Sequence, residues 1–311
     1  MVTAYSPVNG RLVADASGAS DVWHDAVWID LLQASDAQVR QVESVCSVQL
    51  FSAPHRREIE SSSRFFEGPD EVGINLNFIR PEGTSYGSEP VSFKLRGGKL
   101  YSQRNRPYRS FDDTIARLGV GGPATGDEIL IAILEARIDI DADLIEHMSD
   151  GISIIHTRLA EKRVTDRELL IEVAHLQQWT IALRENIAEK QRVISGLQRT
   201  HLFPRHHMDT LRVMHEDIES LVDHCSFNFQ RLEFLQNTFL GIVNMEQNRV
   251  IRIFTVATVL FLPPTLIASI YGMNFKYMPE IAWEHGYLFG LGLMVLSSLA
   301  TWGVFRWRKW L

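Results

Sequence analysis

The chain has 311 residues, of which 45% are hydrophobic and 22% are charged, as expected for a protein with a sizeable core. The charge is unevenly distributed. Residues 249–311 hold six basic and two acidic residues, a net charge of +4, so residues 1–248 carry −11 and the whole chain −7. The acidic part disfavours nucleic acid as a partner, because nucleic-acid-binding proteins need a positive face.

Residues 1–120 predict a small α/β domain. The first residues (MVTAYSPVNGRLVADASG) lack the basic and apolar regions of a signal peptide, so we expect this domain to be cytoplasmic. Gly97-Gly98 predicts a hairpin turn, and residues 36–46 predict a short amphipathic helix. Short β-rich segments bounded by Gly, Pro or Asp are VWIDL (27–31), VGINLNFI (72–79), PVSFKLRGG (90–98) and KLYSQR (99–104).

Residues 121–203 predict long cytoplasmic helices. Apolar residues recur at helical spacing through 127–160, and a similar pattern covers 166–198 before Pro204 interrupts it. The apolar positions are Leu134, Ile138, Ile145, Met148, Ile152 and Ile155. Asp139, Asp143, Glu146 and Asp150 fall on one helix face. Such a face is either solvated or screened by divalent cations.

Residues 204–271 predict one continuous stalk helix that enters a membrane. No proline interrupts the chain between Arg205 and Pro263, so a helix ending at Tyr271 would be on the order of 100 Å long. A single chain cannot bury such a helix, and we therefore expect an oligomer.

Two apolar runs predict membrane spans. Residues 253–270 and 287–305 contain no charged residue, and each approaches the length needed to cross a bilayer. The alternative is a pair of buried helices in a soluble protein. A basic segment, 306–311, follows the second run, and three tryptophans (Trp302, Trp307 and Trp310) cluster at that same end, which favours spans with both termini in the cytoplasm. Residues 272–286 would then form an external loop.

Polar residues of the first apolar run predict a water-filled pore. The stripe that they form on one side of the helix consists of Asn248, Thr255, Thr258, Leu262, Thr265 and Ser269. The alternative is that the hydroxyls bond back to their own helix. Pro263-Pro264 removes helix hydrogen bonds, which lipid tolerates only beside a partner or a cavity.

The segment after this run has the composition of a pore mouth. A neutral amide such as that of Asn274 can hold a hydrated Mg²⁺ through its waters, and weakly enough for release. Gly272 allows the helix to end and neighbouring backbones to approach. Glu280 and Glu284 would concentrate cations in front of it.

Motifs for other chemistry are missing from the sequence. It contains no P-loop, GxSxG, HExxH or dinucleotide fingerprint, which argues against an enzyme. Cys46 and Cys225 are expected to be free thiols. The histidines at 206, 207, 215 and 224 are expected to be solvated, because adjacent helical residues point to different sides. A zinc or pH-sensing role is the alternative.

At this point the sequence resembles the CorA-type magnesium and cobalt transporters of the two-transmembrane GxN superfamily. The resemblance rests on YGMNF (271–275) after a proline-containing span, MPE (278–280), a second span and a basic tail. The stretch from Asn248 to Phe275 is similar to the pore helix of the family along its whole length. WIDL (28–31) and EIESSSRFF (58–66) are looser matches in the first domain.

The resemblance implies a funnel-shaped homopentamer in the inner membrane, with contacts to lipid and no enzymatic activity. Gly272, Met273 and Asn274 match the selectivity filter, Asn248 and Thr265 match pore-lining positions, and Ile251, Phe254 and Leu262 match a hydrophobic gate. In the family, divalent ions bound between subunits close the pore. The usual aspartate is not found on the stalk, where Val213 stands nearby, so Glu216 and Asp217 are the candidate regulatory residues.

Three functions remain open at this stage. The first is passive transport of Mg²⁺, with Mg²⁺ also the regulator and with Co²⁺ or Ni²⁺ as further substrates. The second is zinc transport of the ZntB type on the same scaffold, whose motif usually lacks the Met of Gly-Met-Asn. The third is a membrane-anchored helical scaffold, which would not conduct. Lys276 departs from the family pattern, because an acidic residue is common at this position.

Overall fold

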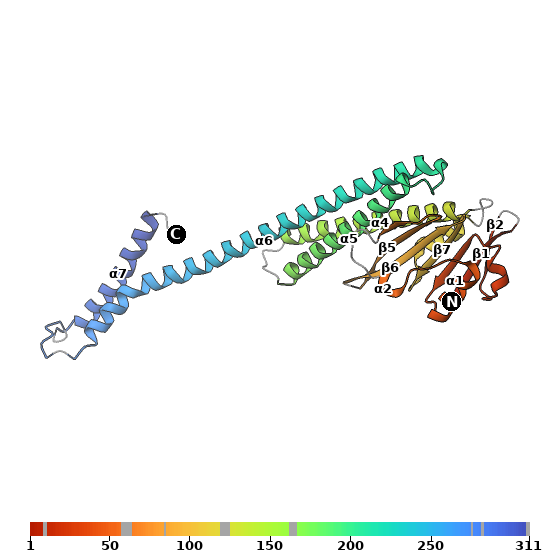
Figure 1. Ribbon diagram of the computed structural model, residues 1–311. Helices are drawn as coiled ribbons and strands as arrows, with labels where there is room; N and C mark the ends of the chain where they lie inside the picture. Colours follow the sequence, from red (N-terminus) through yellow and green to blue (C-terminus); the bar gives the residue numbers. More distant parts are fainter. Residues whose placement is uncertain are drawn as a thin grey trace. The chain divides into compact units, whose positions relative to one another are not determined.

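The computed structural model describes residues 1–8, 11–56, 64–83, 85–118, 125–161, 167–274, 276–280 and 283–308 (Figure 1). The chain divides into two compact units, Met1–Gln236 and Asn237–Leu311. Each unit is described by itself. Helix α6 (Met208–Tyr271) begins in the first unit and ends in the second.

A mixed β-sheet forms one layer of the first unit. Among the described residues it has seven strands in the order β2-β1-β3-β7-β6-β5-β4, in which β3 and β7 pair in parallel and the other neighbours pair antiparallel. The strands are β1 (Val2–Val8), β2 (Arg11–Asp15), β3 (Trp28–Leu32), β4 (Phe65–Glu67), β5 (Glu71–Glu82), β6 (Ser85–Arg96) and β7 (Lys99–Arg104).

The predicted hairpin at Gly97-Gly98 is confirmed. These two residues join β6 to β7 and have φ angles of 57° and 75°. A two-residue turn with positive φ at both central positions matches the twist of the flanking strands and is unfavourable for residues with a Cβ.

A buried polar network joins the parallel pair β3 and β7. The carboxylate of Asp30, within the WIDL segment, accepts hydrogen bonds from Arg104 Nη2 at 2.7 Å and from Ser102 Oγ at 2.6 Å. The indole of Trp28 donates to the same Ser102 hydroxyl at 2.9 Å. Because each buried polar group has a partner, the network fixes the pairing of two strands that lie far apart in the sequence.

The helices of the first unit agree with the sequence pattern where a pattern was found. The predicted helix at 36–46 is α1 (Asp36–Cys46), and Ser35 and Gln38 form a capping box at its start. The two long helical patterns are α4 (Gly126–Glu161) and α5 (Arg167–Arg199). The remaining short elements are η1 (Ser20–Trp23), α2 (Ala53–Arg56), α3 (Arg109–Leu118) and η3 (Arg205–His207).

The core lies between the sheet and the long helices, and Figure 1 shows α4 and α5 beside the strands. All six apolar positions predicted for the first long helix are buried. Leu134, Ile138, Ile145 and Met148 belong to this core, and Leu211, Met214 and Ile218 of α6 join them. Asp139, Asp143, Glu146 and Asp150 are exposed, in agreement with a solvated face. Both cysteines are free, and burial raises the pKa of Cys225 to about 12.

Helices α4 and α5 are also joined by a buried ion cluster. The Asp141 carboxylate contacts the Arg137 guanidinium one turn earlier and lies 2.8 Å from Lys190 Nζ on α5. Burial lowers the pKa of Lys190 to about 8. Burial alone would raise the pKa of Asp141, but Lys190 and Arg137 hold it below its ordinary value. The carboxylate is therefore charged and bridges two buried cations.

The second unit contains the end of α6 and helix α7 (Gly286–Trp307). Both predicted apolar runs lie inside these helices, which are the two in the described part of the chain that are long and apolar enough to cross a membrane. The apolar stretches are almost entirely unburied within the chain, unlike core helices of a soluble protein. Residues 58–63 of the EIESSSRFF segment, Phe275 and residues 309–311 lie outside the described residues.

Candidate functional site

The residues predicted to line a pore share one exposed side of α6. All eight have exposed side chains, and at about 100° per residue they lie within one broad stripe. They are Asn248, Ile251, Phe254, Thr255, Thr258, Leu262, Thr265 and Ser269. The exposed fraction is 52% for Ile251, 69% for Phe254 and 60% for Leu262, so this face is not packed against any part of the described chain.

The opposite side of α6 is turned toward α7. Ser298 of α7 donates a hydrogen bond to the carbonyl of Leu260, and Gly290 of α7 lies beside the Tyr271 ring. Partly buried residues of α6 fall on this same side: Val256, Val259, Leu260, Pro263, Pro264, Ile267 and Tyr271. Their mean direction is roughly 180° from the exposed stripe. Helix α7 therefore leaves the stripe uncovered.

The threonine hydroxyls of the stripe bond back to their own helix. Thr255 donates to the carbonyl of Ile251 at 2.8 Å, Thr258 to Phe254 at 2.8 Å and Thr265 to Phe261 at 2.7 Å. For these three side chains, the structure therefore has the alternative arrangement, in which the hydroxyl bonds to its own helix. Each hydroxyl oxygen keeps its acceptor capacity on the exposed side of the helix, where it can accept from water.

Helix α6 continues through both prolines. Pro264 has no N–H, so it cannot donate to the carbonyl of Leu260 four residues earlier. The hydroxyl of Ser298 donates to that carbonyl at a distance of 3.4 Å. The partner that the sequence analysis required for a proline in lipid is therefore a side chain of the neighbouring helix.

The Gly-Met-Asn segment closes the end of α6. The backbone N–H of Gly272 donates to Ala268 O at 3.0 Å, and that of Met273 donates to Ile270 O at 3.2 Å. Asn274 is exposed, as are Gly272 and Met273. Gly272 does not have a positive φ, and a Cβ there would lie 3.2 Å from the Ala268 carbonyl. The backbone conformation alone does not require glycine at this position.

The connection to α7 places a second glycine under a tighter constraint. A Cβ on Gly286 would lie 2.0 Å from the carbonyl oxygen of Glu280. This distance is too short for a non-bonded contact, so the backbone here accepts only glycine. A cavity of about 480 Å³ lies between the ends of the two helices and is lined in part by Gly272, Glu280 and Tyr287. The side chains of Lys276, Glu280 and Glu284 are exposed.

The two candidate regulatory residues lie in the first unit and differ in their surroundings. Glu216 accepts a hydrogen bond from Arg212 at 3.1 Å. Asp217 faces α4: the pKa of Asp139 is raised by partial burial and then by the negative charges of Glu135, Asp143 and Asp217. Asp217 thus belongs to a group of carboxylates that Arg117 offsets only in part, which makes it the better candidate cation ligand of the two.

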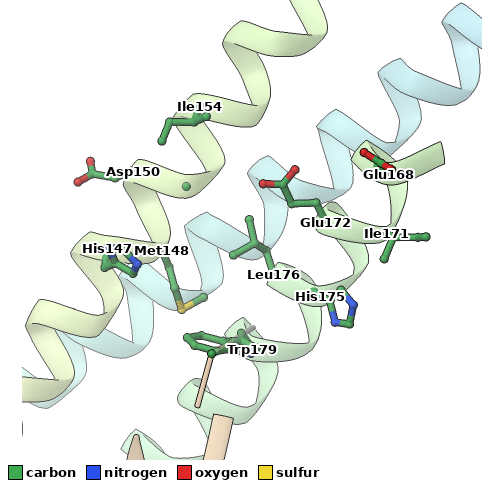
Figure 2. A pocket seen from close by; sticks show the side chains of 12 residues that line it. His147, Met148, Asp150, Ile154, Glu168, Ile171, Glu172, His175, Leu176 and Trp179 are labelled. Atoms are coloured by element: carbon green, nitrogen blue, oxygen red, sulfur yellow. The ribbon is translucent and has the colours of Figure 1, made fainter. Parts of the chain in front are cut away.

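A separate pocket of about 560 Å³ lies between α4 and α5 (Figure 2). His147, Met148 and Asp150 come from α4, whereas His175 and Trp179 come from α5. Glu172 on its rim pairs with Arg158. Within the described residues, none of its histidines or carboxylates belongs to a group with metal-binding spacing. The pocket lies in the first unit and shares no residue with the pore stripe.

One expectation about the histidines is wrong. His206 and His207 lie in the 3-10 turn η3 before α6, where their ring centroids are 4.0 Å apart. Their Nε2 atoms are 4.0 Å and 2.7 Å from the same oxygen, Oδ2 of Asp127. The two imidazoles therefore approach the same carboxylate although they are adjacent in the sequence. Pro204, directly before these residues, was the feature of the sequence that could have predicted a turn here.

Comparison with protein families finds a match to the family model described as CorA-like Mg²⁺ transporter protein, over residues 23–308. A curated relative, the magnesium transport protein CorA of Salmonella typhimurium, is 33% identical over 318 residues, with both chains covered completely.

Solved structures show the same fold. The complete CorA magnesium transporter of Methanocaldococcus jannaschii superposes with a TM-score of 0.84 at 17% identity, covering 100% of this chain and 99% of the other. The ZntB cytoplasmic domain of Vibrio parahaemolyticus superposes with a TM-score of 0.62 at 15% identity, covering 78% and 98%. At these identities, the likeness concerns the fold alone.

Proposed function

The chain belongs to the family of CorA-like Mg²⁺ transporter proteins, and from this premise we propose that it conducts Mg²⁺ passively through a pore lined by α6. As a member of this family it is a divalent-cation transporter and not an enzyme. The driving force is the membrane potential: a doubly charged ion gains about 4.6 kcal/mol per 100 mV, twice the single-charge value.

The exposed stripe of α6 is the observation that carries this proposal. The threonine hydroxyls donate to their own helix but can still accept from water, which lipid would not supply, and α7 contacts the other side of the helix. Further copies of the chain can cover the stripe by placing it around a common axis. We propose a homopentamer, in which five copies of α6 surround the pore and five copies of α7 face the lipid.

Asn274 is the proposed filter residue, together with Gly272 and Met273. Its side chain is exposed beyond the end of α6, so a ring of amide oxygens can contact the water shell of an entering ion. Neutral oxygens leave Mg²⁺ hydrated, which suits an ion that loses water reluctantly. Glu280 and Glu284 would raise the local cation concentration in front of this ring.

The basic residues that flank the two apolar helices support an orientation in the inner membrane. Arg249 and Arg252 precede the first span, and Arg306 and Arg308 follow the second. Both ends would face the cytoplasm, with the Gly-Met-Asn segment on the outer side. This arrangement also puts the acidic first unit in the cytoplasm.

Two further parts of the proposal concern closure of the pore. Ile251, Phe254 and Leu262 supply large apolar side chains on the stripe, and rings of such side chains can close a pore by excluding water. Cytoplasmic Mg²⁺ would favour the closed state by binding near Asp217, where several carboxylates gather. Glu216 is the weaker candidate because Arg212 already neutralises it.

A comparison of ions in liposomes tests the proposed function. The full-length protein is reconstituted with a potential of about 100 mV, negative inside, and uptake of Mg²⁺, Co²⁺, Ni²⁺ and Zn²⁺ is measured separately. We expect Mg²⁺ uptake that increases with the potential, with Co²⁺ and Ni²⁺ as further substrates. Uptake of Zn²⁺ without Mg²⁺ would favour the ZntB-type alternative, and no uptake of any ion would favour a membrane-anchored scaffold.

A further inference from the structure

A second group of metal-binding side chains lies in the first unit, independent of the pore. One ligand atom from each of Asp127, His206 and His207 lies within 4.8 Å of the others. Asp127 Oδ2 is 2.7 Å from His207 Nε2 and 4.0 Å from His206 Nε2. It is the only group of three such residues with this spacing in the part of the chain that the structure describes.

The backbone on each side holds these ligands in place. Asp127 is in the first turn of α4, and Gly126, the first residue of this helix, donates its N–H to Gly98 O at 2.9 Å. A Cβ on Gly126 would lie 2.5 Å from that carbonyl, so the start of α4 is seated directly on the β6–β7 turn. On the other side, the ring of His207 packs on Phe203, with centroids 5.4 Å apart.

The three side chains differ in how far they are exposed to solvent, which would let an ion enter the site. The side chains of Asp127 and His207 are 9% and 10% exposed, whereas that of His206 is 65% exposed. Asp127 and His207 are thus held by the surrounding residues, whereas the exposed side chain of His206 can rotate toward a bound ion. In a tetrahedral site with bonds of ~2.0–2.1 Å, ligand atoms lie ~3.3 Å apart, which falls between the two distances to Asp127.

We propose that Asp127, His206 and His207 bind one first-row transition-metal dication, such as Zn²⁺, Co²⁺ or Ni²⁺, with water in the remaining positions. Two imidazole nitrogens select these ions over Mg²⁺, which prefers oxygen ligands. The bound ion joins the start of α4 to the turn before α6. The site is separate from the proposed pore, so this proposal does not depend on the transport proposal.

Binding of Co²⁺ to the full-length, tag-free protein in detergent tests this site, with millimolar Mg²⁺ present to occupy oxygen sites. We expect a visible absorption band from nitrogen-ligated Co²⁺ that saturates at one ion per subunit and is displaced by Zn²⁺. His206→Ala should weaken binding by at least about tenfold, since even changes outside the ligand shell cost about that much. Asp127→Asn should weaken it further.

His206→Ala is the decisive variant because the side chain is largely exposed and its removal leaves the Asp127–His207 contact intact. His201→Ala is the matched control: this histidine is 79% exposed, lies in the same segment and contacts Glu67 instead. Unchanged Co²⁺ affinity in His206→Ala, or equal losses in His206→Ala and His201→Ala, would overturn the proposal. So would a wild-type protein without the absorption band, in which case Asp127 and His207 form a hydrogen bond only.

Discussion

Lys276 is the single residue that most distinguishes this pore mouth. It lies two positions after Asn274, is exposed, and brings one positive charge per subunit near the path of a cation. For a divalent ion ~10 Å away in water, changing that charge from +1 to −1 is worth on the order of 1–2 kcal/mol before screening. We therefore expect the natural lysine to weaken capture of Mg²⁺ at low concentration.

The corresponding prediction is that Lys276→Glu lowers the Mg²⁺ concentration for half-maximal flux by roughly tenfold at low ionic strength. The effect should shrink at about 0.15 M salt, because the Debye length is then only ~8 Å. Flux in liposomes at several Mg²⁺ and salt concentrations measures both. Lys276→Gln should give an intermediate value, and a shift that does not depend on salt would contradict the electrostatic explanation.

Thr265 allows a matched test of the pore stripe. It donates to the carbonyl four residues earlier, and Thr301 of α7 makes the same kind of bond to Ser297 at 2.9 Å. Thr265→Val and Thr301→Val therefore lose the same hydrogen bond, but only Thr265 lies on the exposed stripe.

We expect Thr265→Val to reduce Mg²⁺ flux by about fivefold, the equivalent of one neutral hydrogen bond of ~1 kcal/mol to a hydrated ion. Thr301→Val should leave the flux within about twofold of wild type. Initial rates in liposomes at matched protein density provide the comparison. Equal losses in the two variants would mean that the stripe does not contact the ion path.

At the scale of elements, the long helices are held together by charges as well as by apolar packing. Asp141 of α4 is fully buried and bridges Arg137 and Lys190. Removing the charge of Asp141 leaves two buried cations without a counter-ion. This lowers the free energy of unfolding by much more than the net stabilisation that the ion cluster provides.

Asp141→Asn is therefore expected to destabilise the first unit by about 3–5 kcal/mol. For a unit of this size, that corresponds to a fall of roughly 10 °C in the melting temperature. Thermal unfolding of the full-length protein in detergent, followed by circular dichroism, gives the value. Asp143→Asn, an exposed carboxylate two residues later, should have little effect, and equal melting temperatures for the two variants would contradict the role of the buried cluster.

The elements that sequence reasoning found are those with a strong local pattern. The hairpin at Gly97-Gly98, helix α1 and the breaks around α4 and α5 follow from turn glycines, a serine cap and helical periodicity. Strands β1, β2 and β4 were not predicted: Pro7 and two small polar residues interrupt the pattern of β1, and β2 and β4 are only five and three residues long. The parallel pairing of β3 with β7 joins distant segments and depends on Asp30 and Arg104, which no local pattern reveals.

The candidate site was predicted from the sequence to a similar extent. Residue spacing placed the pore stripe on one side of a helix, and its exposure follows from that helix being regular. The contact between Ser298 and the carbonyl freed by Pro264 could not be predicted, because it depends on how two helices pack. The histidine pair was misjudged because its contact with Asp127 joins segments that lie about 80 residues apart, which no local pattern reveals.

Conduction by this protein would need several copies of the chain around one axis. One copy offers an exposed polar stripe, a single amide at the end of α6 and a loop with two carboxylates, and none of these encloses an ion by itself. A closed ring turns the stripe inward and multiplies each filter group by the number of subunits. We therefore propose that transport and assembly depend on the same uncovered face.

Mg²⁺ flux through the Asn274→Ala variant in liposomes tests whether Asn274 contacts the transported ion. We predict at least a hundredfold loss of potential-driven uptake, with the oligomer intact by size-exclusion chromatography and light scattering. Tyr277→Phe, which also removes a polar group from this connection, should retain uptake. Flux through Asn274→Ala equal to wild type would contradict the account.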